Sequence, residues 1–416
     1  MAKTARALNA AGLGALERRD YATAEDLFRR AVAIDPYAYW PRKNLARALS
    51  RQRRPQEAEV VLLEMTETWP KDPETARALG DFYATETEDY SLAEKWADRA
   101  VALAPNWADA YSCRANVFSR RSDYEQAIAT YRKAIALKPN DPGLHRSLSR
   151  SLLSLGRFEE AAREAEIAVS LNPMNVQSLT TLGDIYDRWG KYNLAAAAWE
   201  KAAALDSTAS VVSRLAGTYQ RAGQYRKAVE AYERAANLDT TSFYPHLACA
   251  LLFTYYQRDC GRARDYLGRA LLRASTPLAR APMYDLLGTI EALDHQPERS
   301  REAYERAHQI LTPEIKAHPN DPYVLSNAAS VAAHLGDGEK TRDVVKRLLE
   351  VQGESPDFLY GAACALARIG DAEAALTCVE KAVAIGFNDR SIMEVDIDLA
   401  SIRDHPRFKR LLDSMR

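Results

Sequence analysis

The chain lacks the features that mark membrane-spanning, disulfide-bonded and strongly charged proteins. No apolar run approaches the roughly 20 residues that a membrane-spanning helix needs. The five cysteines are odd in number and show no C-x-x-C spacing, which favours buried, reduced thiols over a disulfide framework. Lys and Arg (56) nearly balance Asp and Glu (57), so no net field attracts nucleic acid or an anionic membrane. We therefore predict a cytoplasmic protein without membrane insertion, and we disfavour nucleic acid as a partner.

Residue patterns that are typical of catalysis or of metal binding are also missing. Residues 338–341 (GEKT) resemble a phosphate-binding loop, but no glycine directly precedes Lys340 and the stretch is expected in an inter-helix turn with no strand before it. The seven histidines never stand at i, i+4, and no cysteine lies near them at a zinc-ligand spacing. Cys364 and Cys378 are expected to pack in the core, with a redox pair as the alternative. The sequence therefore predicts no enzyme activity, no metal and no cofactor.

What the sequence does contain is a unit of 34 residues that recurs along almost the whole chain. In residues 108–141 apolar side chains recur at i, i+4 and i+7 in both halves, which predicts two amphipathic helices joined by a tight turn. Pro139 ends the second helix because proline cannot donate to the helical ladder. Aligning the chain on this unit gives about eleven copies. One hairpin alone buries too little apolar surface to be stable, so neighbouring hairpins must stack into a continuous array.

The repeated pattern resembles the tetratricopeptide repeat (TPR) family. The resemblance rests on a small residue near position 8, an aromatic residue near position 11, alanine at positions 20 and 27, and proline at position 32. Small residues at these positions allow two helix backbones to approach closely. The resemblance implies an all-α fold, a right-handed superhelical solenoid of about eleven helix-turn-helix repeats plus a C-terminal cap.

The repeats divide the chain into four predicted regions. The eighth repeat lacks the small residue near position 8, so we expect a bend there or a break between two blocks, and the array is either one rigid superhelix or two hinged blocks. The predicted regions are repeats 1–7 (residues 5–242), divergent repeat 8 (243–280), repeats 9–11 (281–389) and a capping segment (390–416).

The capping segment resembles the end-of-array segment of bacterial TPR proteins. The matching residues are 397–399, 402–403 and 404–408. In such relatives the segment often closes a sensor region that is fused to a DNA-binding, kinase or cyclase domain. The resemblance therefore adds a bacterial source and a regulatory role to the expectations for this chain.

The candidate site is the predicted concave face, which in a TPR solenoid is lined by positions 2, 5, 9 and 13 of the first helices. Basic residues outnumber acidic residues at these positions, and guanidinium groups bind carboxylates or phosphates through paired hydrogen bonds. Alternatively, the arginines at position 13 complement helix C-termini and stay solvated. The predicted peptide-binding residues are Lys43, Arg47, Arg51, Arg77, Asn116, Arg120, Arg146, Arg150, Arg188 and Arg221.

Three functions are compatible with this face. The leading hypothesis is a non-enzymatic scaffold that binds a partner polypeptide, acidic or extended, in the concave groove. The alternative is a regulatory or sensor subunit that acts on a separate kinase, cyclase or transcription factor, and nucleic-acid binding ranks third. A chaperone-tail cofactor is disfavoured because Arg47 and Ala78 stand where the carboxylate clamp of such relatives has asparagine. The partner's identity, the pathway and the oligomeric state are left open.

Overall fold

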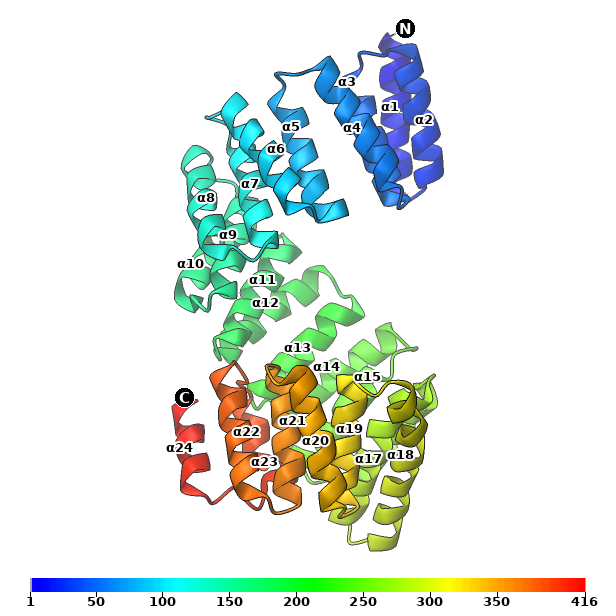
Figure 1. The fold of residues 1–416 in the computed structure, drawn as a ribbon, viewed down its shortest axis with the longest axis vertical. Coiled ribbons are helices and arrows are strands. Elements are labelled where there is room, and N and C mark those ends of the chain that lie inside the picture. The colour runs from blue at the N-terminus through cyan, green and yellow to red at the C-terminus, as the bar shows by residue number, and fades with distance from the viewer. Residues whose placement is uncertain (1, 416) are drawn as a thin grey trace. The chain divides into compact units, whose positions relative to one another are not determined.

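The computed structural model describes residues 2–415 and is built of helices, with no strand in that range (Figure 1). The helices follow one another as eleven hairpins, α1–α2 to α21–α22, and a helical tail follows them. The predicted all-α architecture of helix-turn-helix repeats is confirmed. Among the described residues no helix combines the length and the apolarity that crossing a bilayer requires.

The chain divides into two compact units, unit 1 up to Ile185 and unit 2 from Tyr186. The boundary falls inside α11 (Val176–Arg188). The hinge that the sequence suggests near residues 243–280 stays a prediction. The other helices of unit 1 are α1 (Ala2–Glu17), α2 (Tyr21–Ile34), α3 (Tyr39–Arg51), α4 (Pro55–Thr68), α5 (Pro73–Phe82), η1 (Tyr83–Thr87), α6 (Tyr90–Leu103), α7 (Ala108–Arg120), α8 (Tyr124–Leu137), α9 (Pro142–Ser154) and α10 (Phe158–Leu171).

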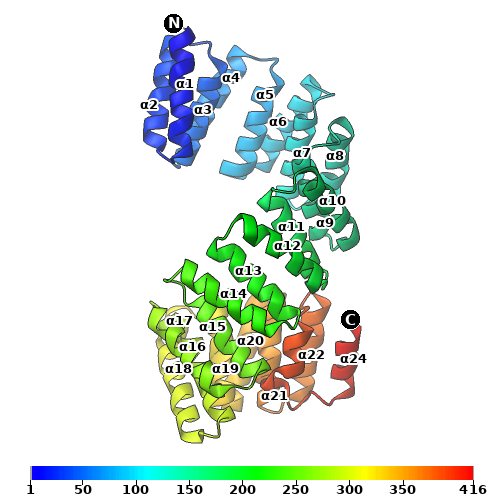
Figure 2. The same cartoon turned by 180° about the vertical axis from the view of Figure 1, so that it is seen from behind.

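Unit 2 continues the same order of hairpins and ends in the tail (Figure 2). Its helices are α12 (Tyr192–Leu205), α13 (Ala209–Arg221), α14 (Tyr225–Leu238), α15 (Tyr244–Leu251), η2 (Leu252–Tyr256), α16 (Cys260–Arg273), α17 (Pro277–Leu293), α18 (Pro297–Ala317), α19 (Pro322–His334), α20 (Gly338–Gln352), α21 (Pro356–Arg368), α22 (Ala372–Ala384), α23 (Arg390–Val395), η3 (Ile397–Leu399) and α24 (Pro406–Ser414).

Small residues let the helices approach closely, as the repeat pattern predicts. A Cβ atom added to Gly80 on α5 would lie 3.0 Å from the Cys113 Sγ on α7 and 3.2 Å from the Ala97 backbone nitrogen on α6. A Cβ atom added to Gly288 would lie 2.4 Å from the ring of Tyr304. Because backbone and ring atoms already fill this space, larger side chains at these positions would force the helices apart.

Two repeats carry one extra residue, and both absorb it in a π-helical turn. The second helices α4 and α6 begin 35 residues apart, as do α14 and α16, where 34 is the usual period. The π-helical turns η1 and η2 stand at the ends of the intervening first helices, and such turns accommodate single insertions. The extra residue of the third repeat is therefore accommodated in η1, and the divergent eighth repeat contains η2.

Each hairpin turn contains one residue in the left-handed backbone region. In the α3–α4 turn this residue is Arg53, with φ of 60°, and the next amide, Arg54 N, donates to the Leu49 carbonyl over 3.1 Å. This hydrogen bond spans six residues and satisfies a backbone carbonyl at the end of the first helix. Glycine occupies the equivalent place in five other hairpins, for example Gly370 with φ of 81°.

Replacing Arg53 by glycine is expected to stabilise the protein. The exposed Arg53 side chain keeps a Cβ atom in a backbone region that disfavours it, so Arg53→Gly should raise the free energy of unfolding by about 0.5–1 kcal/mol. Arg53→Ala is the matched control and should have little effect, because alanine retains the Cβ atom. Urea titration followed by circular dichroism measures both variants. Equal stability of the glycine and alanine variants would contradict the assignment of strain to this turn.

Candidate functional site

The structure places the predicted site residues along the first helices of both units. Arg188 ends α11 and Arg221 ends α13, so these two belong to unit 2. The other eight lie in unit 1, which therefore holds most of the candidate face. They are Lys43, Arg47 and Arg51 on α3, Arg77 on α5, Asn116 and Arg120 on α7, and Arg146 and Arg150 on α9.

Two of the predicted cations in unit 1 are neutralised by neighbouring carboxylates. Arg77 Nε lies 2.7 Å from Glu74 Oε2, and Arg77 also forms an ion pair with Asp81. Lys43, on the preceding first helix, forms an ion pair with the same Glu74 carboxylate. Although burial opposes it, hydrogen bonds from Arg77 and Lys43 hold the pKa of Glu74 below its usual value. Lys43 therefore connects adjacent hairpins, and neither Lys43 nor Arg77 presents unbalanced positive charge.

A pocket of about 580 Å³ with many polar side chains spans α5 to α11. Arg120 and Arg150 are its two cations, and both side chains are exposed. Within residues 2–415 neither guanidinium has an ion-pair or hydrogen-bond partner. The other lining residues are Asp81, Ala84, Thr85, Asn116, Ser119, Tyr124, Tyr131, Ser147, Leu153, Ser154, Thr181 and Asp184.

The wall of this pocket is held by a tyrosine from the core. The Tyr131 hydroxyl donates a hydrogen bond to Asn116 Oδ1, which fixes one amide of the predicted site at the pocket surface. Burial raises the pKa of Tyr131 to about 12, so the phenol stays a neutral donor. Burial likewise raises the pKa of Asp81, although the Arg77 guanidinium opposes this. The pocket thus combines two unpaired guanidinium groups with hydroxyl and amide groups and with the carboxyl groups of Asp81 and Asp184.

The remaining predicted residues of unit 1 differ in their surroundings. Arg146 Nη1 donates to Gln177 Oε1 over 2.7 Å, and burial together with the nearby Arg150 lowers the pKa of Arg146. Arg47 and Arg51 are exposed on α3, and neither has a polar partner among the described residues. Among the predicted cations of unit 1, those without a partner are therefore Arg47 and Arg51 on one helix and Arg120 and Arg150 around the pocket.

Of the two predicted residues in unit 2, Arg221 is paired through its side chain within the fold. Arg221 Nη2 lies 2.8 Å from the buried Asp187 carboxylate, which also accepts from the Thr218 hydroxyl over 2.8 Å. The Arg188 backbone carbonyl accepts a hydrogen bond from Asn388, while its side chain is exposed.

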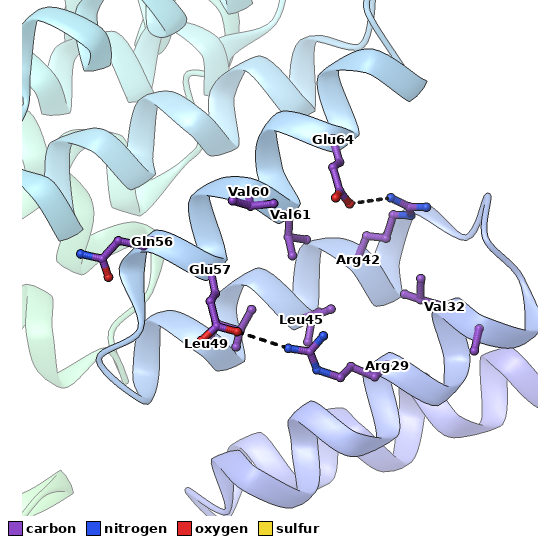
Figure 3. Close-up of a pocket in the computed structure, with 11 residues that line it drawn as sticks. Arg29, Val32, Arg42, Leu45, Leu49, Gln56, Glu57, Val60, Val61 and Glu64 are labelled. Carbon is purple, nitrogen blue, oxygen red and sulfur yellow. Dashed lines mark ion pairs between the residues drawn. The ribbon is translucent and has the colours of Figure 1, made fainter.

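A second, more apolar pocket lies between α2 and α4, with α3 as its floor (Figure 3). It has a volume of about 550 Å³, and Leu45, Leu49 and Val61 line it together with Val60, which is 55% exposed. Two ion pairs cross its rim, Arg29–Glu57 at 3.6 Å and Arg42–Glu64 at 3.5 Å (Figure 3). The pocket is therefore an apolar slot with balanced charge at its edges.

Sequence reasoning did not find several residues that line these pockets. It considered only four positions of each first helix, so Tyr124, which begins α8, was missed. Tyrosine recurs as the first residue of second helices, for example at Tyr90 and Tyr192, and this recurrence is the signal that points to it. Val60 could have been found because the equivalent position holds Asp26, Lys95, Arg163 or Glu230 in other repeats.

The stretch that resembles a phosphate-binding loop is part of a helix. Residues 338–341 form the first turn of α20, which corrects the prediction of an inter-helix turn. The Asp337 carboxylate already accepts from the Lys340 amide over 3.1 Å. A carboxylate at the helix N-terminus opposes binding of a phosphate there. Elsewhere among residues 2–415, no group of three or more His, Cys, Asp or Glu side chains is arranged to hold a metal ion.

Comparison with known families finds matches over the first seven hairpins. Family models described as tetratricopeptide repeat match residues 15–82, 108–141, 146–210 and 211–242. These matches cover the helices that carry all ten predicted site residues.

Curated relatives share parts of the chain. Anaphase-promoting complex subunit 3 of Schizosaccharomyces pombe is 26% identical over 200 residues, which are 48% of this chain and 30% of the relative. Anaphase-promoting complex subunit 7 of Mus musculus is 28% identical over 152 residues, 36% of this chain and 27% of the relative. The STIP1 homolog of Dictyostelium discoideum is 35% identical over 101 residues, 24% of this chain and 18% of the relative. The chain thus spans less than a third of the length of these relatives.

Solved structures are similar over about two fifths of the chain. The crystal structure of MamA is 21% identical and covers 38% of this chain and 93% of its own, with a TM-score of 0.36. The crystal structure of YrrB is 19% identical and covers 43% of this chain and 92% of its own, with a TM-score of 0.36.

The carboxylate shared by Lys43 and Arg77 gives a test of the charge balance on this face. Glu74→Gln leaves both cations without their common partner and should lower the free energy of unfolding by about 1–3 kcal/mol at pH 7. Because the pKa of Glu74 is lowered by folding, its contribution is complete above the unfolded pKa and is lost as the pH falls through the folded pKa. The difference from the native protein should therefore shrink between pH 5 and about pH 3.

Urea titrations at several pH values measure this difference. Glu67→Gln is the matched control, because Glu67 is an exposed carboxylate of unit 1 without a partner among the described residues. An equal and pH-independent loss of stability in both variants would show that Glu74 does not bind the two cations.

Proposed function

Because the chain belongs to the tetratricopeptide repeat family, we propose that it is a protein–protein interaction scaffold that binds a partner polypeptide on unit 1. One observation carries the proposal: the pocket between α5 and α11 has two unpaired guanidinium groups, Arg120 and Arg150, among hydroxyl and amide groups and the carboxyl groups of Asp81 and Asp184. Two of the curated relatives are, by their names, subunits of the anaphase-promoting complex, which agrees with a role in holding proteins together.

The chemistry of the pocket favours an acidic segment in an extended conformation. Arg120 and Arg150 supply planar donors that match a carboxylate from a side chain or a chain terminus. Asn116, Ser119 and Ser147 can hydrogen-bond to the backbone groups of a peptide, and those groups are free only when the peptide is extended. The acidic partner group is thus assigned to Arg120 and Arg150, and Lys43 and Arg77 are left with their structural ion pairs.

The alternative function, a regulatory or sensor subunit, would use the same pocket. A regulatory or sensor subunit would bind its effector through this face, and the end-of-array resemblance of the tail is its support. The cytoplasmic location and the bacterial source stay predictions.

Charge reversal at the pocket tests the proposal. Peptides selected on the full chain from a random displayed library should be rich in Asp and Glu, and Arg120→Glu with Arg150→Glu should weaken their binding at least about tenfold, since charged hydrogen bonds contribute about 1.5–3 kcal/mol each. Fluorescence anisotropy with labelled copies of the selected peptides measures the affinity.

The matched control reverses two arginines on second helices of the same unit. Arg132 and Arg163 are exposed on α8 and α10 and do not line the pocket. Arg132→Glu with Arg163→Glu should leave peptide affinity unchanged within about twofold. If both double variants bind the selected peptides as the native chain does, the pocket is not the peptide-binding site.

A further inference from the structure

The last part of the chain returns to the first hairpins of unit 2. The Tyr192 hydroxyl donates a hydrogen bond to the Asn388 carbonyl over 3.2 Å, and Asn388 Nδ2 donates to the Arg188 carbonyl over 3.4 Å. These partners are 196 and 200 residues apart in sequence. Asn388 therefore hydrogen-bonds at the turn between α11 and α12. We call residues 388–395 the return segment.

The return segment continues along the next hairpins. Ser391 Oγ donates to Asp389 Oδ1 over 2.7 Å, so the hydrogen bond of 3.2 Å between Tyr256 and Ser391 has the tyrosine hydroxyl as its donor. Arg258 Nη2 donates to the Val395 carbonyl over 3.0 Å. Val395 ends α23, so this guanidinium caps the negative end of the short helix.

The groups that hold the return segment occupy similar places in three successive hairpins. Tyr192 begins α12, Tyr225 begins α14 and Tyr256 ends η2. The rings of Tyr225 and Tyr256 lie 4.7 Å apart, and burial together with the nearby Asp389 raises the pKa of Tyr225. We call Tyr192, Tyr225, Tyr256 and Arg258 the tyrosine row. Side chains from adjacent repeats together form the extended surfaces by which solenoid proteins bind their partners.

On its opposite side the return segment packs against the last hairpins, and these contacts are more extensive than those with the tyrosine row. Met393 is fully buried in the core formed by the last hairpins. Just beyond the segment, Asp396 accepts from the Tyr360 hydroxyl over 2.8 Å. Asp398 lies 3.2 Å from His334 Nε2, and Asp285 lies 2.9 Å from His334 Nδ1.

The anchor is therefore ionic as well as apolar. Burial opposes the charged imidazole, but Asp285 and Asp398 raise the pKa of His334 to about 10. The protonated ring thus links α17, α19 and η3 at neutral pH. By contrast, the hydrogen bonds to the tyrosine row are few and mostly exposed, and each contributes only about 0.5–1.5 kcal/mol. The hydrogen bonds to the tyrosine row are therefore the weaker of the two attachments of the segment.

We propose that the tyrosine row is a peptide-docking surface and that the return segment is its resident ligand. A partner polypeptide then binds this surface of unit 2 only by displacing residues 388–395. We expect the partner to present the same groups as the return segment. These are a short helical turn, side-chain amide and hydroxyl groups at its start, and a backbone carbonyl at its end that accepts from Arg258. This surface is independent of the acidic-peptide pocket proposed for unit 1.

Amide hydrogen exchange in the full chain tests whether the contact opens on its own. Tyr256→Phe with Arg258→Ala removes two of the hydrogen bonds and leaves the buried side of the segment untouched. Exchange at residues 390–396 should become at least about tenfold faster, the effect expected from one or two hydrogen bonds, and exchange in α24 should not change. Arg262→Ala is the matched control, because Arg262 pairs with Asp259 on α16 and does not contact the segment.

A labelled peptide of residues 386–398 tests whether the row binds a ligand added in trans. Ser391→Glu places a third carboxylate beside Asp389 and Glu394 and should expel the resident segment. The peptide should then bind the Ser391→Glu chain at least about tenfold more tightly than the native chain, and further substitution with Tyr256→Phe and Arg258→Ala should abolish the gain.

Two results would overturn the proposal. One is unchanged exchange at residues 390–396 in the Tyr256→Phe, Arg258→Ala chain, or faster exchange that includes α24 to the same degree. The other is equal peptide binding by the native and the Ser391→Glu chains. If Ser391→Glu does not fold, as circular dichroism would show, the exchange measurement alone decides.

Discussion

Close packing at small residues is the constraint on which the rest of this structure depends. At Gly80 a Cβ atom would already lie 3.0–3.4 Å from atoms of α6 and α7, and buried alanines such as Ala93 and Ala97 complete the contact. One hairpin has too little apolar surface to offset its loss of chain entropy, so each hairpin is stable only against its neighbours. The side chains that face outward from the first helices are therefore held at a fixed spacing. That spacing turns residues from separate repeats into one pocket.

The same stacking determines which charges remain available to a partner. Lys43 and Arg77 lie close enough to share Glu74 only because α3 and α5 are neighbours. Arg120 and Arg150 lie on α7 and α9 in a similar relation, but no carboxylate pairs with them among the described residues. The proposed selectivity for acidic peptides thus depends on the unpaired state of Arg120 and Arg150, although the Asp81 and Asp184 carboxyl groups line the same pocket.

The sequence was sufficient to predict the hairpins, because each depends on local signals such as the buried alanines and the proline at Pro139. The positions of the candidate residues on first helices were also predictable, since position within a repeat determines the helix face. Their ion pairs were not, because Glu74 and Lys43 are 31 residues apart and belong to different repeats. The contact between Asn388 and Arg188 was even harder to predict from the sequence, because it depends on small rotations between hairpins that accumulate along unit 2.

The dependence of each hairpin on its neighbours is tested most directly by amide hydrogen exchange in a Gly80→Leu chain. Added volume at this contact should lower the free energy of unfolding by about 1–3 kcal/mol or more. If hairpins depend on their neighbours, protection against hydrogen exchange in the Gly80→Leu chain should fall in the hairpins on both sides, α3–α4 and α7–α8, as well as in α5–α6. Gly268→Leu is the control, because nothing lies within 4 Å of a Cβ atom there. Loss of protection that is confined to α5–α6 would contradict the account.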